Sequence, residues 1–424
     1  MFGLGSTFKG LSESLGVIGN AFSYVWFIVL PMAFYFVFKI VWMEYICEMY
    51  IKKTKKVVLE ITPPRNIEKS PKTMESIFSG ISGSLRTPNL FEEYLDGETA
   101  PRYSFEIASD EGTVHFYIRT YKKFQNLMEA HVYAQYPDAI ITEVPDYVDE
   151  VPAIVPNSEW DLYGWDFELV REAPYPIRTY KYFQEDVTGK MIDPLSALLE
   201  AMGKIGPGQK LWLQFVAIPM KEKWNFDERK IVDEIAGRTT KAKGALESIG
   251  KDFGDIFSNF FKAFVSPVEF SKEEKREEQP VEFKLTPGEK EVLKAVESNL
   301  GKNMFKVKTR FIYLGTSQNF DKANNVSSFM GVMKQFNDMN LNSFRPNNKT
   351  KTYADYFFQK PRLRYRQRKI FRRYKDRDPT GVTCVFSTEE LATLYHMPDM
   401  SVVAPSVTYV EAKRGGAPAN LPTE

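Results

Sequence analysis

An uncharged run near the N-terminus constrains this chain more than any other feature. Residues 14 to 38, SLGVIGNAFSYVWFIVLPMAFYFVF, contain no Asp, Glu, Lys or Arg, and apolar side chains continue past Lys39 as IVWM. About 20 predominantly apolar residues are enough to cross the hydrocarbon core of a bilayer as a helix. The run therefore predicts a single transmembrane helix. The side chains that we expect to meet lipid or headgroups are Trp26, Phe27, Phe34, Phe38 and Trp42.

Lysines follow the apolar run directly. Four of them stand within residues 52–56, whereas the segment before the run has one, Lys9. Because lysine-rich flanks stay on the cytoplasmic side, we expect a single-pass protein of the inner (cytoplasmic) membrane with its C-terminal bulk in the cytoplasm. A buried core helix and a cleaved signal peptide are the alternatives. The length of the run and the lack of a small-x-small cleavage site argue against the signal peptide.

Length and composition limit the number of domains and the kinds of binding site that the rest of the chain can form. Its 424 residues are enough for two or three domains, and a hydrophobic fraction of 43% is ample for buried cores. The net charge is only +1, so any affinity for nucleic acid must come from a local cluster of charge. Two cysteines, Cys47 and Cys384, are too few for a disulfide framework or a zinc site and favour a reducing compartment.

The order of expected elements predicts an α+β fold: a transmembrane helix followed by repeated α/β sandwich modules with mostly antiparallel sheets. Alternating residues 102–120, a helical pattern over 121–137 and the strand-like AIITEV form a β-β-α-β unit, and related orders recur twice. The expected segments are the N-terminal segment and transmembrane helix (1–50), modules one and two (51–245), an amphipathic helix and charged linker (246–280), and a third module with a basic helix and C-terminal docking tail (281–424).

No pattern typical of catalysis is present. GKIGPGQK at 203–210 lacks the GK[ST] end of a phosphate-binding loop, and there is no GxSxG nucleophile elbow. The histidines His115, His131 and His396 are too far apart in sequence for HxxxH or HExxH metal spacing. We therefore predict no enzyme, no cofactor and no metal site.

One local charge cluster is strong. Residues 360–377, KPRLRYRQRKIFRRYKDR, hold ten basic side chains and one acidic one, interleaved with aromatic rings. On a helix, Leu363, Ile370, Phe371 and Tyr374 would pack inward and the cations outward. Such a helix could bind nucleic acid, anionic lipid headgroups or an acidic partner surface, or be a solvated face. The candidate anion-binding residues are Arg362, Arg364, Arg366, Arg368, Lys369, Arg372, Arg373 and Lys375.

The stretch STEELATLYHMP at 387–398 begins with a capping box, in which Ser387 or Thr388 and Glu390 satisfy first-turn amides. Its apolar spacing predicts a helix for packing and docking, with His396 in the last turn near the helix dipole. No partner acid or nucleophile for His396 is evident. The candidate partner-docking residues are Glu390, Leu391, Leu394, Tyr395 and His396.

Several phrases resemble one family. After the apolar run come EITPPRNIEKSPKTMESIF, HVYAQYPDAIITEVPDY, DPLSALLEAM, VEFKLTPGEKEVLKAVE and STEELATLYHMP, and then GGAPANLP near the C-terminus. Together they resemble the N-terminal region of membrane-anchored bacterial ATPases of the HerA/FtsK-like superfamily, which are related to type IV secretion and conjugation motors.

The resemblance implies a non-catalytic membrane platform, or accessory subunit, of a secretion- or DNA-transfer-like machine. In that interpretation the chain lacks the ATPase domain and docks a separate motor ATPase or sister subunits. The membrane, DNA and a second copy of the chain are the further partners expected. The alternative is a stand-alone, membrane-tethered nucleic-acid-binding protein.

Overall fold

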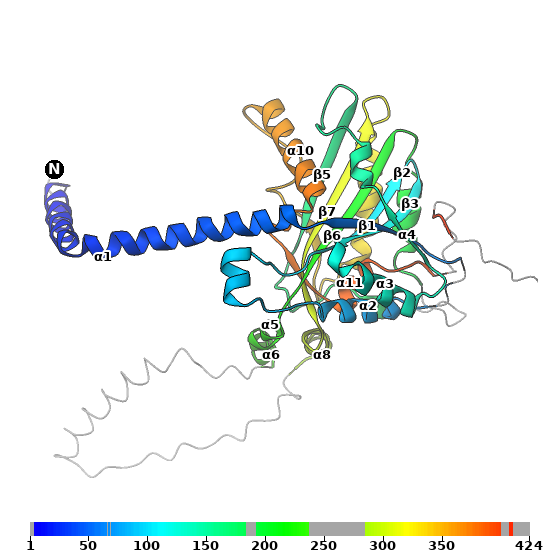
Figure 1. The fold of residues 1–424 in the computed structure, drawn as a ribbon, viewed down its shortest axis with the longest axis horizontal. Coiled ribbons are helices and arrows are strands. Elements are labelled where there is room, and N and C mark those ends of the chain that lie inside the picture. Colours follow the sequence, from blue (N-terminus) through cyan, green and yellow to red (C-terminus); the bar gives the residue numbers. More distant parts are fainter. Residues whose placement is uncertain are drawn as a thin grey trace, which may run out of the picture. The chain divides into compact units, whose positions relative to one another are not determined.

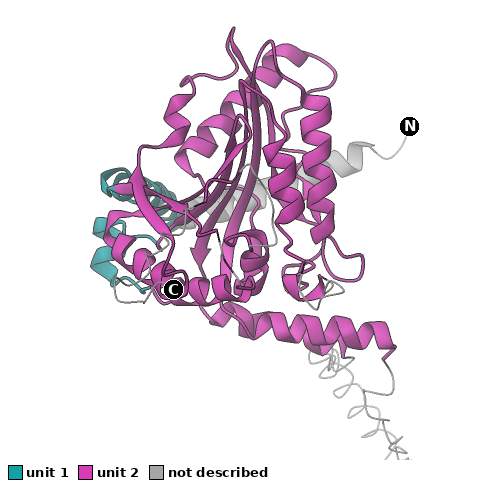
Figure 2. Ribbon diagram, turned by 90° about the vertical axis from the view of Figure 1, so that its right-hand side faces the viewer, with its two compact units in different colours: residues 1–55, 86–100 teal, residues 56–85, 101–424 magenta. Residues whose placement is uncertain are grey.

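The computed structural model of the protein describes residues 4–65, 67, 69–183, 192–236, 285–399 and 407–409. The chain divides into two compact units (Figure 2). Unit 1 comprises residues 1–55 and 86–100, and unit 2 comprises residues 56–85 and 101–424. The predicted linker and amphipathic helix at 246–280 lie outside the described residues.

Unit 1 is built on one long helix, α1 (Leu4–Lys53), with Pro31 inside it. Its part Trp26–Lys53 is long and apolar enough to cross a membrane, and none of its most apolar 18 residues is buried in the protein. The five predicted lipid-facing side chains are 36 to 66% exposed. A second segment of unit 1 contains the short π-helix η1 (Glu92–Asp96). The predicted apolar helix is thus confirmed as a candidate anchor.

Unit 2 is organised around a nine-stranded sheet in the order β4-β1-β3-β2-β6-β7-β5-β8, with β9 also paired to β7 (Figure 1). The strand pairs are antiparallel, which confirms the α+β prediction. The strands are β1 (Lys56–Thr62), β2 (Tyr103–Asp110), β3 (Thr113–Tyr121), β4 (Ile140–Val144), β5 (Trp160–Leu169), β6 (Gln209–Pro219), β7 (Met304–Thr316), β8 (Phe344–Pro346) and β9 (Cys384–Ser387).

Each face of the sheet packs in an apolar core. Successive side chains of a strand point to opposite faces, so one strand contributes to both cores. On β6, Leu211, Leu213 and Phe215 enter the larger core, whereas Trp212 enters a smaller core on the other face. The helices that contribute to the larger core are α2 (Lys72–Ser82), α3 (Gln125–Gln135), α4 (Ser196–Gly203), α9 (Lys322–Met333) and α11 (Thr388–Leu394). The smaller core is closed by η3 (Tyr147–Glu150) and α10 (Gln359–Asp376).

A third apolar cluster joins the short helix α6 (Lys230–Ile235) to α8 (Pro287–Leu300). Met304, the first residue of β7, belongs to the same cluster, and α5 (Lys223–Asp227) contributes Trp224 at its edge. The capping box of α8, made by Thr286 and Glu289, fixes where this helix begins.

The expected separate modules share one sheet. Strand β7, which belongs to the predicted third module, lies between β6 and β5 of the second. Its 13 residues pair along one side with β6 and along the other with β5 and then β9. The boundary expected between 51–245 and 281–424 therefore separates segments of one compact unit, and residues 86–100 belong with α1 instead.

Candidate polyanion-binding site

Helix α10 carries the predicted basic cluster and rests on the sheet by one narrow face. Its buried side chains are Gln367, Ile370, Phe371 and Tyr374, whereas the expected Leu363 is only half-buried. Gln367 replaces it as an inward residue because its amide donates to Asp161 Oδ1 at 2.8 Å and to the Leu162 carbonyl at 2.7 Å. A helix anchored on this face presents its remaining side chains to solvent.

A row of polar side chains crosses the sheet beneath the C-terminal end of α10. Strand register places Glu106, Gln214, Arg310 and Asp166 opposite one another on β2, β6, β7 and β5. Gln214 donates to Glu106 at 3.0 Å and accepts from Arg310 at 3.1 Å, and Arg310 Nε lies 2.8 Å from Asp166. We call these four residues the polar row.

The polar row caps α10. Arg310, which is fully buried, donates to the carbonyls of Arg373 at 2.8 Å and Asp378 at 3.1 Å. Gln214 donates to the Tyr374 carbonyl at 3.2 Å. The last carbonyls of a helix lack partners within the helix and carry partial negative charge, so a cation placed there stabilises the end.

Arg377, directly after α10, ties the same end to the polar row. Its guanidinium holds Glu106 at 2.9 and 3.0 Å and Asp146 at 2.5 and 2.9 Å. Burial alone would raise the pKa of Glu106, but the charge of Arg377 and its hydrogen bonds outweigh burial and hold that pKa below its ordinary value. The buried charges are therefore paired, and these contacts hold the C-terminal end of α10 against the sheet.

A cavity of about 910 Å³ is lined by α10, by one residue each of β5 and β7, and by loop residues 347–350 and 381–382. Asp166 is the acidic side chain in its lining and is already held by Lys308 at 2.8 Å and by Arg310. The cationic side chains of the lining are Lys308, Lys349, Arg362, Arg366, Lys369 and Arg373. Such a lining is suited to an anionic group.

The predicted cations divide into two sets. Arg362 and Arg366 donate to backbone carbonyls of residues 351–357, Arg373 pairs with Asp378 at 3.3 Å, and Lys375 pairs with Asp149 at 2.5 Å. These four position the helix and its loop. The exposed side chains Arg364, Arg368 and Arg372 make no ion pair with any described residue, and Lys369 Nζ lies 5.5 Å from the ring centre of Tyr365. We call Arg364, Arg368 and Arg372 the basic ridge.

The loop before α10 exposes aromatic rings that the sequence interpretation did not single out. Tyr356, Phe357 and Phe358 are 79 to 84% exposed, and Tyr353 and Tyr365 flank them in solvent. Tyr356 and Phe358 have φ of 63° and 55°, in the left-handed region that non-glycine residues rarely adopt. The signal was present as YADYFF next to the cations. We call residues 353–358 the aromatic loop.

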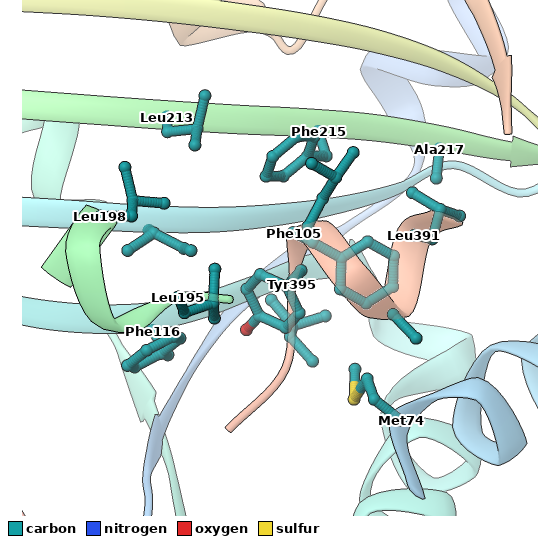
Figure 3. Close-up of a cluster of buried hydrophobic side chains, with 14 of the residues drawn as sticks. Met74, Phe105, Phe116, Leu195, Leu198, Leu213, Phe215, Ala217, Leu391 and Tyr395 are labelled. Carbon is teal, nitrogen blue, oxygen red and sulfur yellow. The ribbon is translucent and has the colours of Figure 1, made fainter. Parts of the chain in front are cut away.

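Helix α11 lies inside the chain's own core, which corrects the expectation that its side chains dock a partner. Glu390, Leu391, Leu394, Tyr395 and His396 are all buried. Figure 3 shows Leu391 near Ala217, and Tyr395 in the centre of the cluster, where its ring contacts Phe105 and Phe116. The capping box is confirmed, with Ser387 Oγ accepting from Glu390 N and Glu390 accepting from Ser387 N. The helix docks onto its own sheet.

His396 has the acidic partner that the sequence did not reveal. Its Nε2 lies 3.0 Å from Asp193 Oδ1, and its Nδ1 lies 2.8 Å from the Ala392 carbonyl. Burial would raise the pKa of Asp193, but His396 and the amides of Asp399 and Leu195 hold it below its ordinary value. This pair joins the end of α11 to the start of α4.

The remaining candidates for chemistry are also in structural positions. His115 contacts Glu60 at 2.7 Å on the sheet, and burial raises the pKa of the Cys384 thiol to about 12. Within the described residues, no three His, Cys, Asp or Glu side chains are grouped so that they could hold a metal ion.

Residues 47–409 match the model of a family described as "Domain of unknown function (DUF8128)", and the chain therefore belongs to that family. The match begins at Cys47, near the end of α1, and covers the whole sheet. No curated protein matches the chain.

Proposed function

We propose that this member of the DUF8128 family is a membrane-anchored, non-enzymatic protein that binds single-stranded nucleic acid on α10 and the aromatic loop. Its anchor would be α1, in the inner membrane. Unit 2 would lie on the cytoplasmic side, because four lysines within residues 52–56 follow the apolar run of α1. The observation that supports this function best is the basic ridge standing next to the exposed rings of the aromatic loop.

The basic ridge supplies the contacts to phosphate. Arg364, Arg368 and Arg372 follow one another at intervals of four residues, so they lie on one side of α10, roughly 6 Å apart along its axis. Their guanidinium groups are exposed and make no ion pair with a described residue, so no internal bond has to break before they bind. A polyanion would be held without regard to sequence and would be released by salt.

The aromatic loop distinguishes a single strand from other polyanions. Bases of a single strand can stack on aromatic side chains, whereas the bases of a duplex are already stacked on one another. Tyr356 and Phe358 adopt an unfavourable backbone conformation while their rings remain in solvent. Backbone strain of this kind is concentrated at functional sites.

The cavity beneath α10 extends the same surface. Lys369 belongs both to the exposed part of the helix and to the cavity lining, where Lys308 and Lys349 add positive charge from other elements. A phosphate of a bound strand could enter there. Anionic lipid headgroups carry the same charge but no bases, so they would engage the cations and leave the rings without a stacking partner.

The test is fluorescence anisotropy of a labelled 30-nucleotide DNA strand with the full chain in detergent, between 50 and 300 mM salt. Replacing Arg364, Arg368 and Arg372 by Gln should weaken binding at least tenfold and reduce the salt slope by about 2, since each phosphate contact contributes about 0.7 for single strands. The matched control removes three exposed cations elsewhere: Lys290, Lys294 and Lys306 to Gln.

Three results would contradict the proposal. The first is an unchanged affinity of the ridge variant, and the second is an equal loss in the control variant. The third is binding to vesicles that contain phosphatidylglycerol with no binding to DNA, which would assign α10 to the membrane surface instead.

A further inference from the structure

A second segment of unit 1 packs along the C-terminal part of α1. Trp42 Nε1 donates to the Tyr94 carbonyl at 2.8 Å, and Lys39 Nζ lies 5.2 Å from the centre of the Tyr94 ring. Gly97 has φ of 70°, and a Cβ there would come within 2.5 Å of the Ile46 carbonyl group. The close approach therefore needs glycine, and it holds the segment against the helix backbone.

These contacts set the depth of the segment along α1. Gly97 lies at the level of Ile46, and Tyr94 lies at the level of Trp42 and Lys39. Moving back along the chain from Gly97 therefore moves toward the apolar run of α1. A hydrocarbon core needs about 20 apolar residues, which the run supplies up to about Lys39. Tyr94 and the residues just before it lie where that core would end.

Three apolar side chains of the segment are exposed. Leu90, Phe91 and Leu95 are 63 to 74% exposed, and Phe91 and Leu95 are four residues apart in a helical stretch. The acidic side chain of Glu92 is bound within the same segment. It accepts from Asn89 N at 2.8 Å and pairs with Arg86 at 2.9 Å. Leu90, Phe91 and Leu95 therefore form an exposed apolar patch, and the exposed acidic side chain of Asp96 follows it directly in the sequence.

We propose that Leu90, Phe91 and Leu95 form a second contact with the membrane, at the boundary between lipid headgroups and acyl chains. This contact presupposes that α1 is the anchor proposed above, but it does not depend on nucleic-acid binding by α10. The surface is continuous with α1, and its depth corresponds to the level where Trp42 would meet the headgroups. Apolar side chains on a short helical element gain most when they are buried just below the headgroups.

The experiment measures the depth of single positions in proteoliposomes of phosphatidylcholine and phosphatidylglycerol. On a background with Cys47→Ser, Phe91→Cys or Leu90→Cys is labelled with an environment-sensitive fluorophore; Cys384 is only 2% exposed and escapes labelling. Lipids with a quenching spin label near the headgroup then report contact. Two control positions are Asp96→Cys, an exposed polar site on the same segment, and Phe34→Cys, in the middle of α1.

We expect probes at positions 90 and 91 to emit at shorter wavelength than the probe at 96 and to be quenched at least twofold more by the shallow spin label. Emission and quenching equal to those at position 96 would overturn the membrane contact. So would a blue shift without quenching, which would mean that a protein surface, such as a second copy, covers the patch. If the probe at position 34 were not quenched by a deep spin label, the anchor itself would fail, and that result is distinguishable from failure at position 91.

Discussion

Individual residues of the α10 region have roles that their types alone do not show. The sequence predicted eight cations as equivalent candidates, but Arg362, Arg366, Arg373 and Lys375 hold the helix and its loop in place. Arg310 and Arg377 were not candidates, yet Arg310 donates to a carbonyl at the end of α10 and Arg377 joins that end to Glu106. Only the strand register brings the residues of the polar row together, and this register depends on pairings between residues 96 to 144 positions apart.

Arg310 should matter for stability more than any residue of the basic ridge. Replacing Arg310 by Ala leaves Asp166 with Lys308 as its remaining ion-pair partner among the described residues and removes two donors from the end of α10. Breaking a buried ion pair costs about 3–5 kcal/mol. We expect a loss of that order in the free energy of unfolding, measured with urea. Arg372→Ala, at an exposed position, should change it by less than about 0.5 kcal/mol; a similar loss in both variants would contradict the capping role.

The stability of the fold should depend on pH through the carboxyl group of Glu390. Burial raises its pKa from 4.5 to about 7, although donors from Ser387 and Ile177 oppose the rise. The folded chain therefore binds this proton more tightly than the unfolded chain, and ionisation removes stability as the pH rises through that window.

Glu390→Gln should remove this dependence, because glutamine keeps an acceptor for the capping box and has no proton to lose. Its free energy of unfolding, relative to the wild type, should rise by about 1–3 kcal/mol between pH 5 and pH 8. Glu291→Gln, at an exposed position on α8, serves as control. A constant difference across this range for Glu390→Gln would show that burial does not shift the pKa of Glu390.

Elements were easier to predict than their arrangement. Period-two and helical spacing predicted β2, β3, α3 and β4, and the capping box predicted α11, because these patterns are local. The sheet order was not predictable in the same way. Strand β7 pairs with β5 and β6 across large gaps in sequence, so three apparent modules became one sheet. The cavity beneath α10 combines residues from β5, β7 and later loops, and no local pattern marks it.

A substitution in the aromatic loop should weaken strand binding without lowering the stability of the fold. Phe358 has φ of 55°, a conformation that costs non-glycine residues roughly 1–2 kcal/mol. Phe358→Gly should therefore leave the melting temperature unchanged or raise it, while removing a ring that stacks on a base. We expect a loss of affinity for single-stranded DNA of about fivefold to 150-fold, since stacking contributes about 1–3 kcal/mol per base. Affinity equal to the wild type in anisotropy would show that this ring does not touch the strand.

For the whole molecule, the apolar N-terminal helix and the α+β body were predictable because both depend on composition and periodicity. The resemblance to membrane-anchored motor ATPases remains a prediction, as does docking of a separate motor. With the side chains of α11 buried, such a motor would have to bind another surface of this chain. What the described surface offers instead is α10 with its aromatic loop.

Co-flotation tests membrane anchoring and strand binding together, because a labelled strand floats only if one molecule has both the anchor and the binding site. The full chain is reconstituted in neutral phosphatidylcholine vesicles, so that lipid charge does not compete, and mixed with a labelled single strand and an equal amount of labelled duplex. We expect the single strand to float with the vesicles at 50 mM salt, at least fivefold more than the duplex, and to be released at 300 mM. Vesicles carrying the Arg364, Arg368 and Arg372 to Gln variant should float without the strand. Protein that stays at the bottom of the gradient, or wild-type vesicles that float with no bound strand, would contradict the proposed function.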